Sequence, residues 1–175
     1  MKILDATAGF RMMHFDKNNP LVTYFDIRDD AKLKMDLQRV PNRKPWNPSK
    51  PTMQGDYRNL PFENDTFDLV LFDPSHFTKL GKTSVYYVKY GNLNKETWHE
   101  DLMKATQEIW RVLKPNGFLI FKWCTQEIPI KDVLKLFPVQ PLFGQRTVGG
   151  QGSNRDKPRT FWFTFVKMGD IINVN

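Results

Sequence analysis

Short apolar segments alternate with polar and helix-forming segments along the chain, and this alternation limits the folds open to it. The clearest apolar segment is Leu69-Val70-Leu71-Phe72. Alternating strands and helices are typical of α/β proteins, in which helices cover the faces of a sheet. We therefore predict an α/β fold with strands at Ile3–Leu4, Leu21–Phe25, Thr52–Gln54, Leu69–Phe72, Phe118–Trp123, Pro141–Gln145 and Thr160–Lys167.

Two helices are expected from the spacing of apolar residues. The clearest runs from about Thr97 to Leu113, where apolar residues recur at helical intervals. Thr97 and Glu100 have the spacing of a capping box, in which each side chain bonds the backbone N–H of the other residue. The turn-forming sequence "KPNG" should then lead into the next strand. A second helix is expected over Ile130–Phe137.

Length and composition indicate one soluble, folded domain that covers residues 1–175. Apolar residues make up 40% of the chain, which argues against disorder. The net charge of +7 is compatible with a polyanionic partner such as nucleic acid, without requiring one. Cys124 is the only cysteine, so an internal disulfide and a multi-cysteine zinc site are excluded. We expect a reduced, cytoplasmic setting, with no metal, signal peptide or membrane span.

Three segments with basic residues are expected to be loops, at residues 39–51, 77–94 and 149–158. The second interleaves tyrosines with lysines, a pattern that suits stacking on bases and contacts to phosphates. An ordinary solvated loop explains the same composition. The basic residues proposed to contact phosphates are Arg43, Lys44, Lys79, Lys82, Arg155 and Lys157.

Four of the expected strands are followed closely by an acid: Asp5, Asp26, Asp56 and Asp73. Ligands of open α/β sheets bind beyond the carboxyl ends of the strands. A single aspartate often ends a strand as a turn residue, but four along one sheet edge predict a binding site. The first acid begins "DATAGF", whose small residues allow a ligand to approach the backbone, although a tight turn needs the same residues.

The segments around these acids resemble class I S-adenosylmethionine-dependent methyltransferases. The cofactor-binding region of that family is similar to "LDATAGF" together with Asp26, which lies near the spacing of a ribose-binding acid. Its third and fourth strands are similar to "GDYRNLPFENDTFDLVLFDP", and its later helix–turn–strand unit to "IWRVLKPNGFLIFKW". The resemblance covers nearly the whole chain. It implies a Rossmann-like methyltransferase fold: a mainly parallel seven-stranded sheet with the last strand antiparallel and helices on both faces.

The resemblance also implies S-adenosylmethionine as the cofactor. Asp5 and the Ala6–Gly9 turn would contact its methionine part, and Asp26 would hold the ribose hydroxyls. Ile27 would pack on the adenine, whose ring or amine would meet Asp56 and Tyr57. The full set of cofactor-binding residues so implied is Asp5, Ala6, Thr7, Ala8, Gly9, Asp26, Ile27, Asp56 and Tyr57.

The sequence "DPSH" resembles the D/N-P-P-aromatic motif of methyltransferases that modify exocyclic amines of adenine or cytosine. Such an amine is a poor nucleophile because its lone pair is delocalised into the ring. Hydrogen bonds to the aspartate and to the proline carbonyl would position it for attack. The fourth residue of the motif stacks on the extruded base. The resemblance therefore implies a catalytic segment made of Asp73, Pro74, Ser75 and His76.

Two departures from this motif bear on activity. Ser75 replaces the second proline and adds a hydroxyl, and His76 replaces a larger aromatic ring with one that titrates near neutrality. Arg11 stands where many relatives carry a glycine, and is either a ligand of the cofactor carboxylate or a solvated helix residue. His14 is expected at the surface or at the boundary of the core, and Trp162 in the core.

We predict transfer of a methyl group from S-adenosylmethionine to an exocyclic amino group of nucleic acid, with adenine in DNA as the preferred target. An RNA base methyltransferase and a catalytically silent, cofactor-binding subunit of a nucleic-acid-binding complex remain open. The chain is similar to compact single-domain enzymes of phages and mobile elements. With so little room for a recognition domain, we expect target specificity to come from loops, a second copy or a partner subunit.

Overall fold

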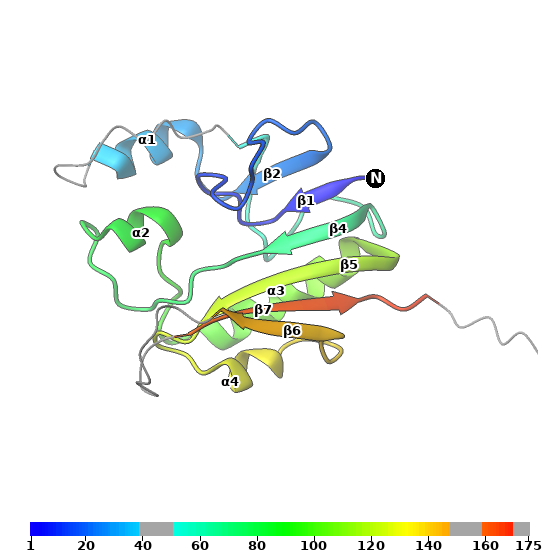
Figure 1. Cartoon of the computed structure of the whole chain (residues 1–175). Coiled ribbons are helices and arrows are strands. Elements are labelled where there is room, and N and C mark those ends of the chain that lie inside the picture. The colour runs from blue at the N-terminus through cyan, green and yellow to red at the C-terminus, as the bar shows by residue number, and fades with distance from the viewer. Residues whose placement is uncertain (39–50, 148–158, 170–175) are drawn as a thin grey trace, which may run out of the picture.

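The computed structural model describes residues 1–38, 51–147 and 159–169. Within them seven strands form one sheet in the order β3-β2-β1-β4-β5-β7-β6 (Figure 1). The strands are β1 (Ile3–Asp5), β2 (Val22–Asp26), β3 (Met53–Gln54), β4 (Phe67–Phe72), β5 (Leu113–Cys124), β6 (Phe143–Thr147) and β7 (Thr160–Val166). The described helices are α1 (Asp30–Gln38), α2 (Val85–Tyr90), α3 (Trp98–Val112) and α4 (Ile130–Leu134).

Six strands run in one direction and β7 runs against them. The pairs from β3 through to β5 are parallel, while β7 pairs antiparallel with both β5 and β6. The predicted mainly parallel seven-stranded sheet with an antiparallel last strand is therefore confirmed. All seven expected strands are present, although β5 begins earlier than expected, at Leu113. The expected "KPNG" turn lies within β5, where Asn116 takes a positive φ of 64° and the pairing with β4 shifts register.

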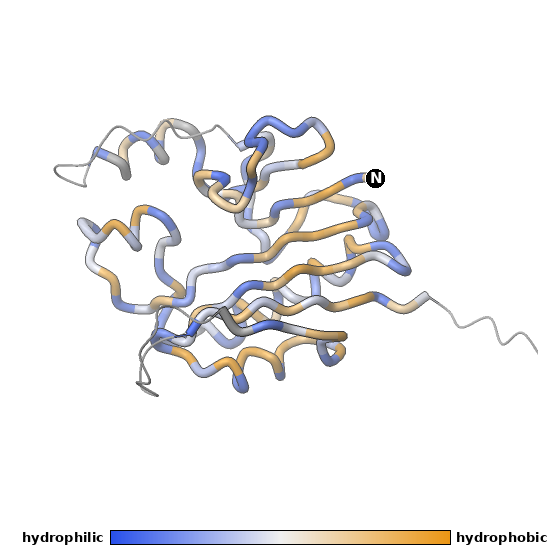
Figure 2. The backbone as a smooth tube through the Cα atoms, in the orientation of Figure 1, coloured by the Kyte–Doolittle hydropathy of each residue, from blue (hydrophilic) through white to orange (hydrophobic). Residues whose placement is uncertain are grey.

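In Figure 1, α3 lies behind the sheet, and the main core lies between α3 and the sheet face that it covers. Leu119, Phe121 and Trp123 of β5 alternate with more exposed residues and are completely buried on this face. α3 contributes its apolar stripe to the same core, with Leu102, Ala105, Ile109 and Val112 all buried. The hydropathy colouring shows the central strands as largely apolar between polar turns (Figure 2).

α3 begins as expected but its N-terminus is capped differently. Thr97 is the N-cap residue, yet its side chain caps no backbone N–H. Its hydroxyl instead donates to Asp101 Oδ2 at 2.8 Å. The expected capping box between Thr97 and Glu100 is therefore wrong, because the carboxylate one residue further along takes the hydroxyl.

The first crossover, residues 6–21, consists of turns. One of the two interpretations of Arg11 places it on a helix in this segment. Arg11 has a positive φ of 52° and is only 7% exposed, with its guanidinium 3.7 Å from the centre of the Tyr24 ring. It also donates to the carbonyl of Lys17. Arg11 is thus a buried part of this crossover, and the alternative of a solvated helix residue is wrong.

The segment 77–94, expected as a loop, contains the short helix α2. Ser84 caps its start by accepting from the backbone N–H of Tyr86, and Gly91 ends it with a positive φ of 71°. The residues between have little helix preference of their own, so the cap and the glycine define this helix. No helix within the described residues is both long and apolar enough to cross a membrane.

α3 gives a direct test of this packing. Ile109→Ala should lower the free energy of unfolding by about 2–5 kcal/mol, because Ile109 is completely buried and its loss leaves a cavity. Met103→Ala on the same helix is the matched control, since Met103 is 37% exposed. Urea unfolding followed by circular dichroism measures both. Equal losses in the two variants would contradict the described core.

Candidate active site

Two adjoining cavities lie at the carboxyl ends of the parallel strands. The first cavity, of about 390 Å3, is lined by Asp26, Asp56 and Asp73 among others. The second cavity, of about 320 Å3, includes Asp5 in its lining. Both cavities are bounded by the same four residues at their junction: Thr7, Asp73, Lys89 and Tyr90. The structure thus places the four strand-end acids around one composite site.

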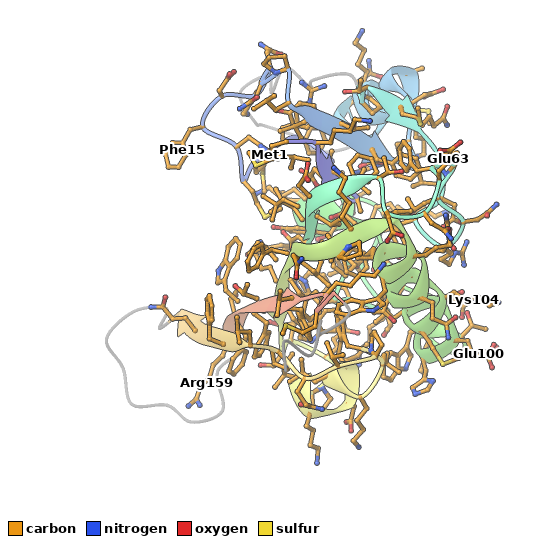
Figure 3. All side chains as sticks on the ribbon, turned by 90° about the vertical axis from the view of Figure 1, so that its right-hand side faces the viewer. Met1, Phe15, Glu63, Glu100, Lys104 and Arg159 are labelled. Atoms are coloured by element: carbon orange, nitrogen blue, oxygen red, sulfur yellow. The ribbon has the colours of Figure 1, made fainter. Side chains whose placement is uncertain are left out.

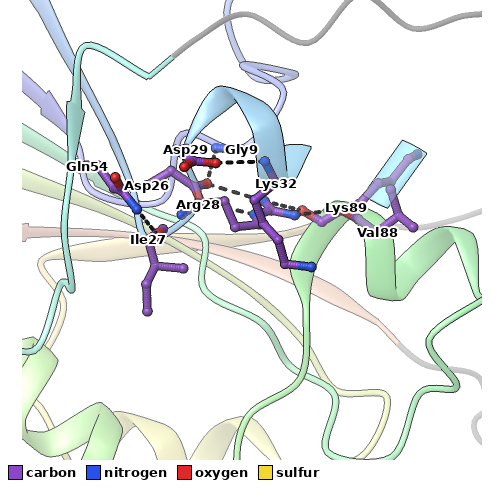
Figure 4. Close-up of polar contacts among 9 residues, drawn as sticks. All are labelled: Gly9, Asp26, Ile27, Arg28, Asp29, Lys32, Gln54, Val88 and Lys89. Atoms are coloured by element: carbon purple, nitrogen blue, oxygen red, sulfur yellow. Dashed lines mark hydrogen bonds and ion pairs between the residues drawn. The ribbon is translucent and has the colours of Figure 1, made fainter. Parts of the chain in front are cut away.

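Asp26 ends β2 and is held by a network that reaches three segments (Figure 4). Its Oδ2 accepts from the backbone N–H of Gly9 at 2.8 Å, and its Oδ1 accepts from Arg28 Nε at 3.0 Å. Arg28 also donates to the carbonyl of Val88 in α2 at 2.6 Å. Gly9 needs its positive φ of 48° to make this approach. Asp26 therefore joins the first turn to α2 while its carboxylate lines the first cavity.

The far wall of the first cavity combines apolar surface with an ion pair. Ile27 is 59% exposed on this wall although it is a large apolar side chain. Tyr57 packs edge-on against Phe72, and burial raises the pKa of its hydroxyl to about 12. Asp56 pairs with Arg58 at 2.6 Å, and this hydrogen bond lowers the pKa of the carboxyl. The wall therefore offers an apolar surface beside fixed polar groups.

The end of β1 is joined to the end of β4 through one turn. Asp5 is 1% exposed and its Oδ1 accepts from the backbone N–H of Thr7 at 3.2 Å. The Thr7 hydroxyl in turn accepts from the backbone N–H of Asp73 at 2.8 Å. Asp5 Oδ2 lies 2.8 Å from His14 Nε2, whose side chain is only 10% exposed. His14 is partly buried, in agreement with the boundary position that was one of the two locations expected for it.

Asp73 is buried at the junction of the two cavities, with its side-chain oxygens in different environments. Lys122 Nζ of β5 donates to Oδ2 at 2.5 Å. Oδ1 is buried and has no hydrogen-bond partner among the described residues. Burial raises the pKa of the Asp73 carboxyl, and the positive charge of Lys122 opposes that rise. The structure therefore leaves one carboxylate oxygen of Asp73 without a partner inside the site.

The residues after Asp73 are fixed to α2. The Ser75 hydroxyl donates to the carbonyl of Gly91 at 2.9 Å and accepts from the backbone N–H of Phe77 at 3.3 Å. Pro74 and Ser75 both line the first cavity. The hydroxyl that replaces the second proline of the motif therefore ties this segment to the end of α2.

His76 lies beneath the site and lines neither cavity. It is 6% exposed, and its ring packs on Phe77 at 4.1 Å and on Tyr90 at 5.4 Å. Burial, followed by the charge of Lys122, lowers the pKa of the imidazole to about 4. The expected titration of His76 near neutrality is therefore wrong. Its role in stacking on a base stays a prediction.

Three residues of this site were not recognised in the sequence: Lys122, Arg28 and Trp162. Lys122 lines the second cavity, and its charge interrupts the apolar run of β5, which is the signal that could have marked it. Trp162 lines the same cavity, although it had been expected in the core. The predicted phosphate contacts of Arg43, Lys44, Arg155 and Lys157 lie outside the described residues, whereas Lys79 and Lys82 lie within them.

No protein-family model and no curated protein sequence matches this chain. Solved structures do match it. A SAM-dependent methyltransferase of Methanosarcina mazei aligns with a TM-score of 0.53 and 13% identity over 95% of this chain and 92% of that chain. The PH0226 protein of Pyrococcus horikoshii aligns with a TM-score of 0.52 and 18% identity over 95% and 81%.

A third match adds a ligand complex. The 1,6-didemethyltoxoflavin-N1-methyltransferase of Burkholderia thailandensis, with its substrate and S-adenosylhomocysteine bound, aligns with a TM-score of 0.52 and 15% identity over 95% and 71%. Together with the strand order, these matches show that the chain has a Rossmann-like methyltransferase fold.

The buried imidazole predicts how stability depends on pH. A folded-state pKa near 4, below the ordinary 6.5, means that stability is full above about pH 6.5 and falls as the pH drops toward 4. The full shift corresponds to about 3 kcal/mol. His76→Phe should lose less stability over this range, because it removes the titrating group and keeps an aromatic ring. Urea unfolding at pH 7 and pH 4 gives the comparison, and equal pH dependence of the two proteins would reject it.

Proposed function

We propose that this protein transfers a methyl group from S-adenosylmethionine to an exocyclic amino group of a nucleobase, with adenine in DNA as the preferred target. The observation that supports this most is the position of Asp73. It lies where the two cavities meet, with a buried Oδ1 that has no partner among the described residues. A cofactor in one cavity and an acceptor amine in the other would then meet beside a carboxylate.

The first cavity fits the cofactor in size and in chemistry. Its volume of about 390 Å3 lies within the usual range of small-molecule sites. Asp26 already accepts four hydrogen bonds from Gly9 and Arg28, so it would bind the ribose hydroxyls in exchange for part of its pairing with Arg28. The exposed side chain of Ile27 would pack on the adenine, beside Asp56 and Tyr57. The methionine part would then extend toward Ala6 and Thr7, which line the first cavity. Asp5, Ala8 and Gly9 of the same turn line the second cavity.

The chemistry needs an amine whose lone pair points at the methyl group. The bound cofactor supplies an electrophilic methyl group on a sulfonium centre. Asp73 Oδ1 would accept a hydrogen bond from the amine N–H, and the Pro74 carbonyl would accept a second. Both bonds draw the amine out of conjugation with its ring, and holding the reactants in line lowers the barrier further. Asp73 and Pro74 thus act by positioning the acceptor.

Nucleic acid as the acceptor is supported by charge and by exposed aromatic surface. The net charge of +7 favours a polyanion. Phe15 lies in the first crossover and projects into solvent (Figure 3). Its near neighbours in sequence, Met12 and Met13, line the second cavity. An exposed aromatic ring of this kind is suited to stacking on bases.

Asp26→Asn should weaken binding of S-adenosylhomocysteine about tenfold or more, because charged hydrogen bonds contribute roughly 1.5–3 kcal/mol. Titration calorimetry measures the affinity. Asp132→Asn on α4 is the matched control, since Asp132 forms only an exposed ion pair with Lys135. Equal affinities of wild type and the Asp26→Asn protein would remove Asp26 from the cofactor site.

Asp73→Ala should abolish methyl transfer, because alanine offers no oxygen to accept a hydrogen bond from the amine. Radiolabelled S-adenosylmethionine, supplied with unmethylated DNA and RNA in parallel, measures the transfer, and calorimetry with S-adenosylhomocysteine shows that the cofactor site is intact. A wild-type rate in this variant would reject the proposed role of Asp73. A wild-type protein that binds the cofactor product but methylates neither nucleic acid would favour the silent-subunit alternative.

A further inference from the structure

Lys122 lies where its positive charge acts on the protonation of the Asp73 carboxyl. It enters the site from β5, a strand that carries none of the cofactor-binding or catalytic residues implied by the methyltransferase resemblance. Its Nζ lies 2.5 Å from Asp73 Oδ2, and 5.7 Å and 5.6 Å from the ring centres of Tyr90 and Trp162. Cation–π contacts of this kind hold an ammonium group in place. Lys122 is therefore fixed between two rings on the wall of the second cavity.

The charge of Asp73 decides whether it can help an amine to react. An ionised carboxylate only accepts hydrogen bonds, so it would bind the N–H groups of the amine and leave the nitrogen lone pair for the methyl group. A protonated carboxyl could donate to that lone pair and block it. Burial alone favours the protonated form, and a nearby cation favours the ionised form.

We propose that Lys122 is a positioning residue for methyl transfer: it binds Oδ2 of the Asp73 carboxylate, keeps the group ionised, and so presents Oδ1 to the acceptor amine in the second cavity. This inference rests on the proposed function. In the step itself, a bond forms between the amine nitrogen and the methyl carbon while the carbon–sulfur bond breaks. The electron pair of that bond stays on sulfur, and one N–H proton leaves past Oδ1 to solvent.

Several other groups face Asp73 and Lys122. Asp5 at the end of β1 tends to raise the pKa of Asp73. Tyr90 of α2 tends to raise the pKa of Lys122, and Lys89 of α2 bounds both cavities. His76 stays neutral above about pH 4. Burial tends to lower the pKa of Lys122, but Asp73 outweighs it and the pKa is raised. Lys122 is the cation in contact with the carboxylate.

The test replaces Lys122 by methionine, which keeps the chain length and removes the charge. The pKa of Asp73 should then rise, so methyl transfer to unmethylated DNA, or to RNA if wild type methylates RNA, should fall about tenfold or more at pH 7. The rate should recover as the pH is raised toward 9, whereas Lys122→Arg should keep the pH profile of wild type. A second readout needs no activity: carbon-detected NMR of the Asp73 carboxyl in the ligand-free protein should show a higher pKa in Lys122→Met than in wild type.

Lys114→Met is a matched control. Lys114 also lies in β5 and pairs with an aspartate of β4, Asp68, at 2.9 Å, but outside both cavities. It should leave the rate, the pH profile and the Asp73 titration unchanged. An unshifted Asp73 titration in Lys122→Met, or a wild-type rate and pH profile, would overturn this inference. Full activity of Asp73→Ala would instead overturn the proposed function itself, so the two failures can be told apart.

Discussion

The parallel pairing of β1 with β2 and with β4 is the constraint on which the candidate site depends. Because the three strands run in one direction, Asp5, Asp26 and Asp73 all emerge at the same edge of the sheet. The registers place Asp5 opposite Tyr24 and Leu71, so these strand ends lie within a few residues of one another. The direction of the strands thus brings together residues that are far apart in the sequence, before any local interaction adjusts them.

Local hydrogen bonds then join these strand ends into one unit. Thr7 links the first turn to the backbone of Asp73, and Gly9 links the same turn to Asp26. Arg28 and Ser75 both bind carbonyls at the end of α2, at Val88 and Gly91. α2 is therefore attached to β2 and to the segment after β4 by side chains that also line the first cavity. A change in any of these side chains would alter the binding site and the position of α2 together.

The sequence predicted the sheet well because its signals are local. A short apolar run such as Leu69–Phe72, followed by turn residues, predicts a buried strand, and the acid that follows it can be read directly. The sequence did not predict the first crossover, where Arg11 takes a positive φ, or α2, which begins at the cap formed by Ser84. Apolar periodicity indicates neither feature. Nor did it predict Lys122 beside Asp73. That contact depends on the pairing of β4 with β5, which joins residues 49 positions apart.

The burial of His76 and the charge of Lys122 are two parts of one electrostatic arrangement. A protonated imidazole would place a second cation near Lys122, and this repulsion adds to the cost of burying a charged ring. With His76 neutral, the one positive charge of Lys122 is balanced by the one negative charge of Asp73. A histidine at position 76 therefore fits the role proposed for Asp73, because a neutral histidine packs on Phe77 and Trp123 as an aromatic ring would. In this arrangement the ring at position 76 supports the site from below, and Tyr90 and Trp162 are the rings on the wall of the second cavity.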